Sequence, residues 1–183
     1  MSPLGLSAVA ITGGAAAIGT GLVFATAGIA KLRNRRVFPG VVANYRLMPE
    51  AFVKPVALVL PFAELALGLA LVAGIGRFAA PAIALLLVFA AAMAINIGRG
   101  RAHIDCGCGR SELRQPLSRT LVMRNLGLAL LLVPTLVATP VFASAEWLIA
   151  LAGGLALFLL THLVNVLAAL ATGPLASMER NSR

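Results

Sequence analysis

Five long apolar segments set the limits on how this chain of 183 residues can fold. A helix needs about 20 residues to cross a hydrocarbon core about 30 Å thick, because each helical residue rises about 1.5 Å. The segments that reach or approach this length are residues 7–30, 55–75, 78–97, 121–137 and 147–170. Backbone amides in lipid must be hydrogen-bonded within their own segment, so we expect each segment to be a helix.

The composition agrees with a membrane protein. Hydrophobic residues make up 60% of the chain and charged residues 11%, whereas soluble domains have about 45–50% and about 25%. The mean hydropathy is +0.97. The sequence therefore predicts an all-α integral membrane protein, in which residues 1–183 form a single bundle of about five transmembrane helices.

The connections between the segments differ in length. Residues 74–77 predict a tight turn, so the second and third segments should form an antiparallel hairpin. Residues 37–45, within the longer connection 31–54, have the apolar spacing of a short amphipathic helix. The fourth segment is short, and Pro134 should end or kink its helix because proline lacks a backbone N–H.

The basic residues predict an orientation, because Lys and Arg in short connections remain on the cytoplasmic side. The connections after the first and third segments contain Lys31, Arg33, Arg35, Arg36, Arg46, Lys54, Arg99, Arg101, Arg110, Arg114 and Arg119. The opposite side has only Arg77. These positions predict an outer N-terminus and an inner C-terminus. The net charge of +9 then indicates contact with anionic lipid rather than with nucleic acid.

Two cysteines, Cys106 and Cys108, lie in the connection 98–120 with Gly107 between them. Extended backbone would place their Cα atoms about 6.6–7.2 Å apart, whereas a disulfide requires about 4.4–6.8 Å. The chain must therefore turn, and Gly107 permits a positive φ. A ring this small is strained, and strain makes a disulfide easier to reduce. We interpret the pair as the catalytic groups of thiol–disulfide exchange.

Two other interpretations of the cysteines stay open. They could be small apolar side chains without chemistry, or they could bind a metal together with His103 and Asp105. The two Cys-x-x-Cys pairs of a typical zinc site are absent from the sequence.

Charged neighbours should tune the reactivity of the cysteine pair. Arg99, Arg101 and Arg110 would favour the thiolate form, whereas Asp105 would oppose it.

Polar residues inside the apolar segments are further candidates. Glu64 should face the bundle interior, where it handles protons, pairs with a cation such as Arg124, or is a neutral acid hydrogen-bonded to a neighbour. Amide and imidazole side chains that could hydrogen-bond across helices are Asn96, Asn125, His162 and Asn165. His162 and Asn165, three residues apart on one helix face, could instead contact a quinone carbonyl.

Several motifs together resemble the methylamine utilisation protein MauE family, which belongs to the DoxX-like membrane proteins. They occupy residues 27–32, 44–49, 60–68 and 92–109, and the resemblance continues through Arg124 and Asn125. The family implies a four-helix DoxX-like core with one additional helix in the bacterial inner membrane. In outline such a bundle is similar to the quinone-coupled thiol oxidases of the vitamin K epoxide reductase type.

The resemblance also implies a role in maturing the disulfide-containing small subunit of methylamine dehydrogenase, together with the thioredoxin-like protein MauD. A membrane quinone would be the electron acceptor, and no other cofactor is expected. A non-catalytic scaffold for MauD and the subunit, or a metal-handling protein, are the alternatives. The family role lies in the periplasm, whereas the charge pattern places the cysteines in the cytoplasm, where thiols are kept reduced.

Overall fold

The computed structural model describes residues 3–107, 115–137 and 144–172. These ranges are largely helical, and their one β-type pairing is an isolated bridge between Asp105 and Pro116. The helices are α1 (Pro3–Arg33), α2 (Phe38–Asn44), α3 (Glu50–Val72), a 3₁₀ turn η1 (Gly76–Phe78), α4 (Ala79–Gly98), α5 (Arg119–Leu132), α6 (Pro134–Val137) and α7 (Ser144–Thr172).

Five helical stretches in the described ranges are long and apolar enough to cross a membrane. They are α1, α3, η1 with α4, α5 with α6, and α7, which confirms the five predicted spans. The short helix expected within residues 37–45 is α2. The expected break at Pro134 is also confirmed, because α5 ends at Leu132 and α6 begins at Pro134.

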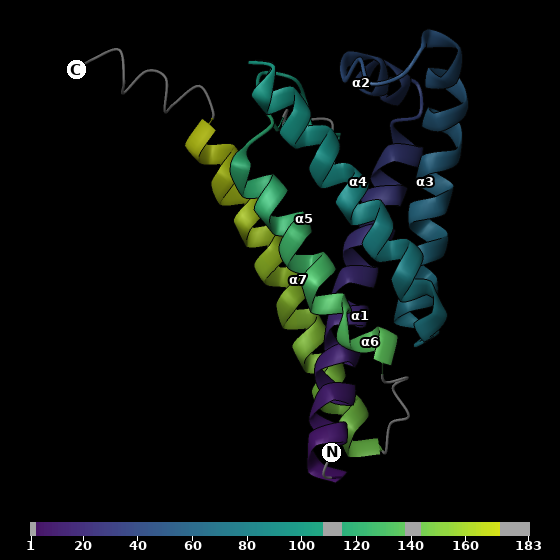
Figure 1. Ribbon diagram of the computed structural model, residues 1–183, viewed down its shortest axis with the longest axis vertical. Coiled ribbons are helices and arrows are strands. Elements are labelled where there is room, and N and C mark those ends of the chain that lie inside the picture. Colours follow the sequence, from purple (N-terminus) through teal and green to yellow (C-terminus); the bar gives the residue numbers. More distant parts are fainter. Residues whose placement is uncertain (1–2, 108–114, 138–143, 173–183) are drawn as a thin grey trace, which may run out of the picture.

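Helix α1 is the centre of the bundle and packs most extensively against α3 and α7 (Figure 1). Glycines allow these backbones to approach closely. A Cβ on Gly68 of α3 would lie 2.6 Å from the carbonyl oxygen of Gly21 in α1. A Cβ on Gly19 would lie 2.8 Å from the carbonyl oxygen of Gly154 in α7. Larger side chains at these crossings would force the helices apart.

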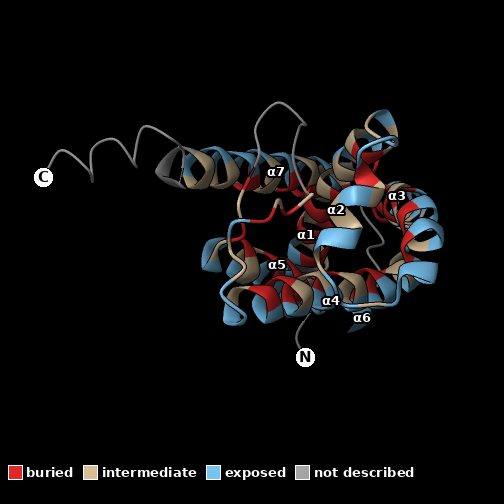
Figure 2. Ribbon diagram, turned by 90° about the horizontal axis from the view of Figure 1, so that it is seen from above, coloured by how far each residue is buried: buried red, intermediate tan, exposed pale blue. Residues whose placement is uncertain are grey.

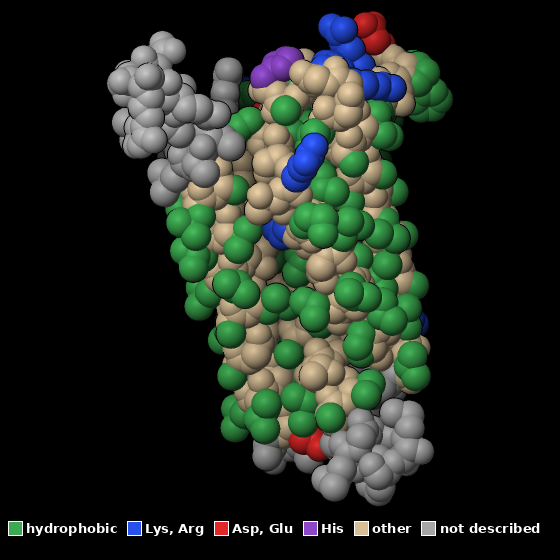
Figure 3. Space-filling model, turned by 60° about the vertical axis from the view of Figure 1, so that its left-hand side comes forward, with side chains coloured by type: hydrophobic (Ala, Val, Ile, Leu, Met, Phe, Trp, Pro, Cys, Tyr) green, Lys and Arg blue, Asp and Glu red, His purple; other side chains and the backbone are tan. Residues whose placement is uncertain are grey.

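Helices α4 and α5 form a second closely packed pair. Their apolar side chains join those of α1 and α3 in one core of buried residues: Ala16, Ala17, Phe24, Leu71, Ala79, Ala82, Leu86, Leu128, Ala129 and Leu132. Buried residues line the inside of the bundle and exposed ones the outside (Figure 2). The outward-facing residues include many large apolar side chains, and hydrophobic side chains are spread along the whole length of the face in Figure 3. This is the surface that a bilayer would cover.

The helices separate towards one end of the bundle. α3 and α4 are joined through η1 but otherwise make few contacts, and α7 diverges from α1 along its C-terminal half (Figure 1). α2, residues 99–107 and residues 115–118 lie at this end, which we call the cysteine end. The N-terminus and the α3–α4 turn with Arg77 lie at the opposite end.

The two basic connections therefore share one end of the molecule, as the charge pattern predicts. Which compartment this end faces stays a prediction. Lys31 does not belong to the solvent-facing basic set, because its side chain is 6% exposed and turns into the bundle.

Candidate functional site

The cysteine connection folds back on itself. The backbone N–H of Cys106 donates to the carbonyl oxygen of Gln115 at 2.9 Å, and the N–H of Leu117 donates to the carbonyl oxygen of Ile104 at 3.2 Å. These bonds hold residues 104–106 antiparallel to residues 115–117. Cys108 and Arg110 lie outside the described residues.

Gly107 has the positive φ that its place between the cysteines predicts, at +69°, and the approach of the two sulfurs stays a prediction. Asp105 stabilises this turn, since its Oδ1 accepts a hydrogen bond from the N–H of Gly107 at 3.0 Å. This backbone contact is a role that the sequence did not predict for Asp105. A Cβ on Gly107 would lie 3.0 Å from Cγ1 of Val41 in α2, so the turn also packs closely against that helix.

Replacing Gly107 by alanine should therefore loosen the cysteine end. A left-handed conformation costs an L-residue about 1–2 kcal/mol, and the new methyl group would also press on Val41. Gly100→Ala is the matched control, because Gly100 has a φ of +72° but open space around it. We expect a larger loss of stability and faster alkylation of Cys106 for Gly107→Ala than for Gly100→Ala. Equal effects would show that the contact with α2 is unimportant.

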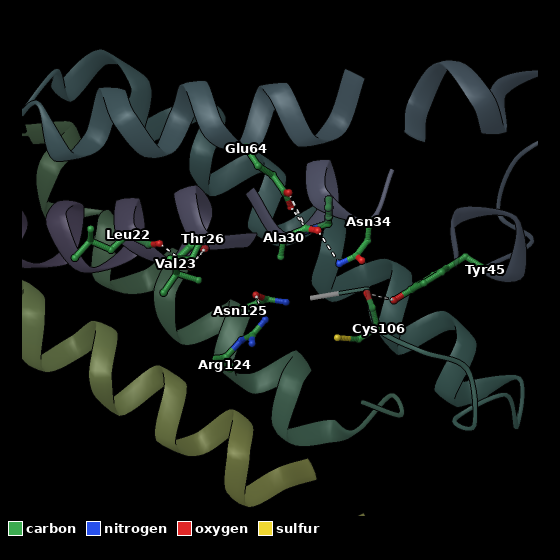
Figure 4. A network of polar contacts seen from close by, with 11 residues as sticks. Leu22, Val23, Thr26, Ala30, Asn34, Tyr45, Glu64, Cys106, Arg124 and Asn125 are labelled. Carbon is green, nitrogen blue, oxygen red and sulfur yellow. Dashed lines mark hydrogen bonds and ion pairs between the residues drawn. The ribbon is translucent and has the colours of Figure 1, made fainter. Parts of the chain in front are cut away.

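Cys106 is buried, with 7% of its surface exposed. It packs with the apolar side chains of Met93, Ile104, Leu117 and Leu121. The Tyr45 hydroxyl donates to the Cys106 carbonyl oxygen at 3.1 Å, and the Cys106 thiol lies 3.9 Å from its acceptor, Oε1 of Gln115. In Figure 4 the sulfur points away from Tyr45, towards the side where Arg124 and Asn125 lie.

Arg99 and Arg101 were predicted to stabilise a thiolate. In the structure they donate to backbone oxygens at and just after the end of α2. Arg101 donates to the carbonyl oxygen of Asn44 at 2.7 Å and to Oδ1 of Asn96 at 3.3 Å. Arg99 donates to the carbonyl oxygen of Arg46 at 3.4 Å. These bonds attach the end of α4 to the end of α2. An electrostatic effect on the cysteines stays a prediction.

An apolar cavity of about 460 Å³ reaches Cys106. It lies where α3 and α4 diverge, and α2 also lines it. Its walls include Phe38, Val42, Tyr45, Leu60, Val88, Phe89 and Met93. The lining also includes the charged side chain of Lys31. A flat apolar ring could therefore lie beside the buried cysteine.

A second, polar cavity of about 580 Å³ lies where α1 and α7 diverge, and α5 also lines it. Lys31 and Glu64 line it and form a buried ion pair, with Nζ 2.8 Å from each carboxylate oxygen. Glu64 is 1% exposed, so it faces the interior as predicted. Its ion-pair partner is Lys31, however, and not Arg124, which the sequence suggested.

Lys31 therefore lines both cavities. Its Nζ also lies 5.8 Å from the ring centroids of Phe38 in α2 and Phe89 in α4. One side chain of α1 thus contacts α2, α3 and α4 where the two cavities meet.

Arg124 lines the polar cavity and is held by amide oxygens. Its Nη1 donates to Oδ1 of Asn165 at 2.6 Å, and its Nη2 donates to Oδ1 of Asn125 at 3.3 Å. Gln115 continues this network, because its Nε2 donates to the carbonyl oxygen of Asn165 at 3.2 Å. Hydrogen bonds thus link Cys106, through Gln115 and Asn165, to Arg124.

The other polar candidates lie apart from this network. Asn96 is fully buried, and its Nδ2 donates to the carbonyl oxygen of Ala92 in its own helix. His162 is exposed and contacts the ring of Phe158 edge-on at 4.7 Å. His103 is exposed, and within residues 3–107, 115–137 and 144–172 no three metal-binding side chains come together. The alternative metal site includes Cys108, which lies outside these ranges.

The sequence analysis missed Lys31, Tyr45 and Gln115 as members of the site. A signal for Lys31 existed, because an acid inside a membrane segment requires a nearby cation. Tyr45 and Gln115 contact Cys106 only through tertiary folding, so their local sequence gives no comparable signal.

Comparisons with known proteins agree on one family. The model for methylamine utilisation protein MauE matches residues 8–138. Methylamine utilization protein MauE of Methylorubrum extorquens is 44% identical over 111 residues, which cover 60% of this chain and 60% of that protein, less than two thirds of it. The protein of the same name from Paracoccus denitrificans is 42% identical over 161 residues, covering 82% of this chain and 86% of that protein. No solved structure matches significantly.

Proposed function

The chain belongs to the MauE family of methylamine utilisation proteins, and from this premise we propose that it is a membrane thiol–disulfide oxidoreductase whose exchanging groups are Cys106 and Cys108. Its role would be to support disulfide formation in the small subunit of methylamine dehydrogenase. Its direct partner would be a thioredoxin-like protein of the MauD type, in the bacterial inner membrane system.

The observation that carries this proposal is the position of Cys106 between a tight turn and an apolar cavity. The positive φ of Gly107 brings the chain round immediately after Cys106, and the cavity wall includes Cys106 itself. A cysteine pair at such a position can exchange with a partner on one side and with a lipid-soluble oxidant on the other.

The exchange would proceed through two attacks by thiolates of the partner. A thiolate of the partner attacks one sulfur of the Cys106–Cys108 disulfide, so that a mixed disulfide forms and the other cysteine leaves as a thiolate. The partner's second thiolate attacks its own sulfur in the mixed disulfide, which leaves the partner oxidised and both cysteines reduced. A quinone held beside Cys106 in the apolar cavity would supply the oxidising equivalents: the two electrons and two protons of the dithiol would pass to it, and the Cys106–Cys108 disulfide would be restored.

We place the quinone in the apolar cavity rather than beside His162 and Asn165. Cys106 lines the apolar cavity, whereas His162 and Asn165 line the polar one. The Oδ1 atom of Asn165 already accepts a hydrogen bond from Arg124. The volume of about 460 Å³ is in the range of small-molecule sites, about 300–1,000 Å³.

Cys106→Ser and Cys108→Ser should each abolish maturation of the dehydrogenase, because either change removes one of the two sulfurs. One of the single variants should also accumulate a mixed disulfide with the oxidised form of the thioredoxin-like partner, since its remaining thiolate can attack the partner's disulfide but the second cysteine that would release the partner is missing. The measurements are dehydrogenase activity, the disulfide state of the small subunit, and non-reducing electrophoresis of the trapped species.

The double variant Cys106→Ser/Cys108→Ser is the control, and it should trap nothing. Full maturation in the double variant would contradict the proposal and favour a non-catalytic scaffold. An impermeant thiol reagent applied from each side then determines where the pair reacts. Labelling from the periplasm supports direct exchange with a periplasmic partner, whereas labelling only from the cytoplasm excludes it.

A further inference from the structure

The polar cavity contains more positive charge than its described residues neutralise. Its lining includes Lys31, Arg33 and Arg124 as cations and Glu64 as an acid. Lys31 and Glu64 neutralise each other at 2.8 Å. The described partners of Arg124 are the neutral amide oxygens of Asn165 and Asn125. Burying a guanidinium in a membrane bundle costs free energy unless a counter-ion is present. We therefore expect an anion beside Arg124.

Two hydrogen-bond donors beside this charge remain available. Nε of Arg124 and Nδ2 of Asn125 are buried and have no hydrogen-bond partner within the described part of the chain. Asn125 is 2% exposed and lines the cavity. Figure 4 shows its amide nitrogen directed away from Arg124. Buried donors normally have partners, so these two indicate a ligand with acceptor oxygens.

The surrounding bonds fix both donors in place. Oδ1 of Asn165 holds one terminal nitrogen of Arg124, and Oδ1 of Asn125 holds the other. The amide oxygens therefore face the guanidinium, and the two donors left for a ligand, Nε of Arg124 and Nδ2 of Asn125, would bind different oxygens of it. Arginine with an additional N–H donor is a typical arrangement for binding a phosphate group.

The shape of the cavity indicates the source of that phosphate. Its volume is about 580 Å³, and apolar side chains of α1, including Val23, Phe24 and Ile29, form part of its wall. Ile29 of α1 and His162 of α7 in the lining are exposed, and these two helices diverge towards this end (Figure 1). A ligand with an anionic head group and an acyl chain would fit this wall, because the head group would pair with the cationic residues and the chain would pack against the apolar ones.

We propose that the polar cavity binds the phosphate group of an anionic phospholipid, with Arg124 and Asn125 as its donors and the groove between α1 and α7 as the path of an acyl chain. This site is independent of the proposed cysteine chemistry. It makes the lipid a bound component of the bundle and the counter-ion of Arg124.

The test is native mass spectrometry of the full chain in detergent, titrated with phosphatidylglycerol, phosphatidylcholine or inorganic phosphate. We expect bound phosphatidylglycerol on the wild type, weaker binding of phosphatidylcholine and no binding of inorganic phosphate. Arg124→Gln should weaken phosphatidylglycerol binding about tenfold or more, and Asn125→Leu should weaken it less. Arg119→Gln is the matched control, because Arg119 begins the same helix but is exposed.

Equal binding of phosphatidylglycerol by the wild type and Arg124→Gln would overturn the proposal. Binding of inorganic phosphate as tightly as the lipid would overturn the lipid assignment. Glu112 and Glu179 lie outside the described residues, so a Glu112→Gln/Glu179→Gln variant tests whether a carboxylate of the chain is the counter-ion instead. Tighter binding of phosphatidylglycerol in this variant than in the wild type would show that a carboxylate of the chain competes as the counter-ion and would count against the proposal, whereas unchanged binding supports it. Arg124→Lys, which keeps the charge but not the fork of donors, should bind with intermediate affinity and controls for misfolding of Arg124→Gln.

Discussion

Replacing Lys31 by methionine is expected to destabilise the bundle by about 3–5 kcal/mol, because removing one partner of a buried ion pair leaves the other charge uncompensated. The Glu64 carboxylate that would remain is 1% exposed. The change would also remove the cation that lies 5.8 Å from the rings of Phe38 and Phe89. We expect α2 and the cysteine end to loosen together with the α1–α3 contact, and the measurement is denaturant unfolding in detergent micelles.

Two further variants separate the charge from the volume of the side chain. Lys54→Met is the matched control, because Lys54 is exposed on α3, and it should have little effect. The double variant Lys31→Met/Glu64→Leu should recover much of the lost stability, since replacing both charges leaves neither one buried alone. If Lys31→Met alone were as stable as Lys54→Met, the ion pair would not hold these helices together.

The sequence could predict a cation near Glu64, but it could not identify that cation as Lys31. The apolar segments predicted the five spans because segment length and bilayer thickness are linked directly. Lys31, however, lies at the start of a basic run that ends at Arg36, and its local sequence resembles that of its solvent-facing neighbours. Its inward direction depends on how α1 is rotated against α3, which brings Glu64 within reach. That rotation is a property of tertiary packing.

At the cysteine end, too, some features could be predicted from the sequence and others could not. The positive φ at Gly107 could be predicted from the spacing of two cysteines and the freedom of glycine, and it is observed at +69°. The contacts of Cys106 with Tyr45 and Gln115 could not be predicted, because they join residues from separate connections. The two cavities could not be predicted either. They lie where helices diverge, and the hydropathy of a single segment does not depend on how far it lies from its neighbours.

The crossing of α1 and α3 did have a signal in the sequence. Gly21 and Ala25 lie four residues apart, which is the small-xxx-small pattern of close helix packing in membranes. Both residues contact Gly68 of α3: a Cβ there would lie 2.6 Å from the carbonyl oxygen of Gly21 and 2.7 Å from the backbone nitrogen of Ala25. The pattern predicts a close approach but not its partner, since several glycines could supply the opposite face.

Gly68→Leu should therefore be severely destabilising, by about 3 kcal/mol, because overpacking a tight contact forces a backbone shift. The atoms nearest to the added Cβ belong to the backbone of α1, so no side-chain rotation can relieve the clash. Moving α3 away from α1 would also lengthen the Lys31–Glu64 ion pair, which joins the same two helices. The loss should appear in unfolding measurements and as greater reactivity of Cys106.

Gly127→Ala provides the control for this prediction. Gly127 lies in α5 with nothing within 4 Å of an added Cβ, and alanine is the better helix former by about 1 kcal/mol. This variant should be neutral or slightly stabilising. The coupling can be measured by combining Gly68→Leu with Lys31→Met. If α3 has already moved, the second change should cost less than it does alone, whereas fully additive losses would mean that the helix crossing and the ion pair act independently.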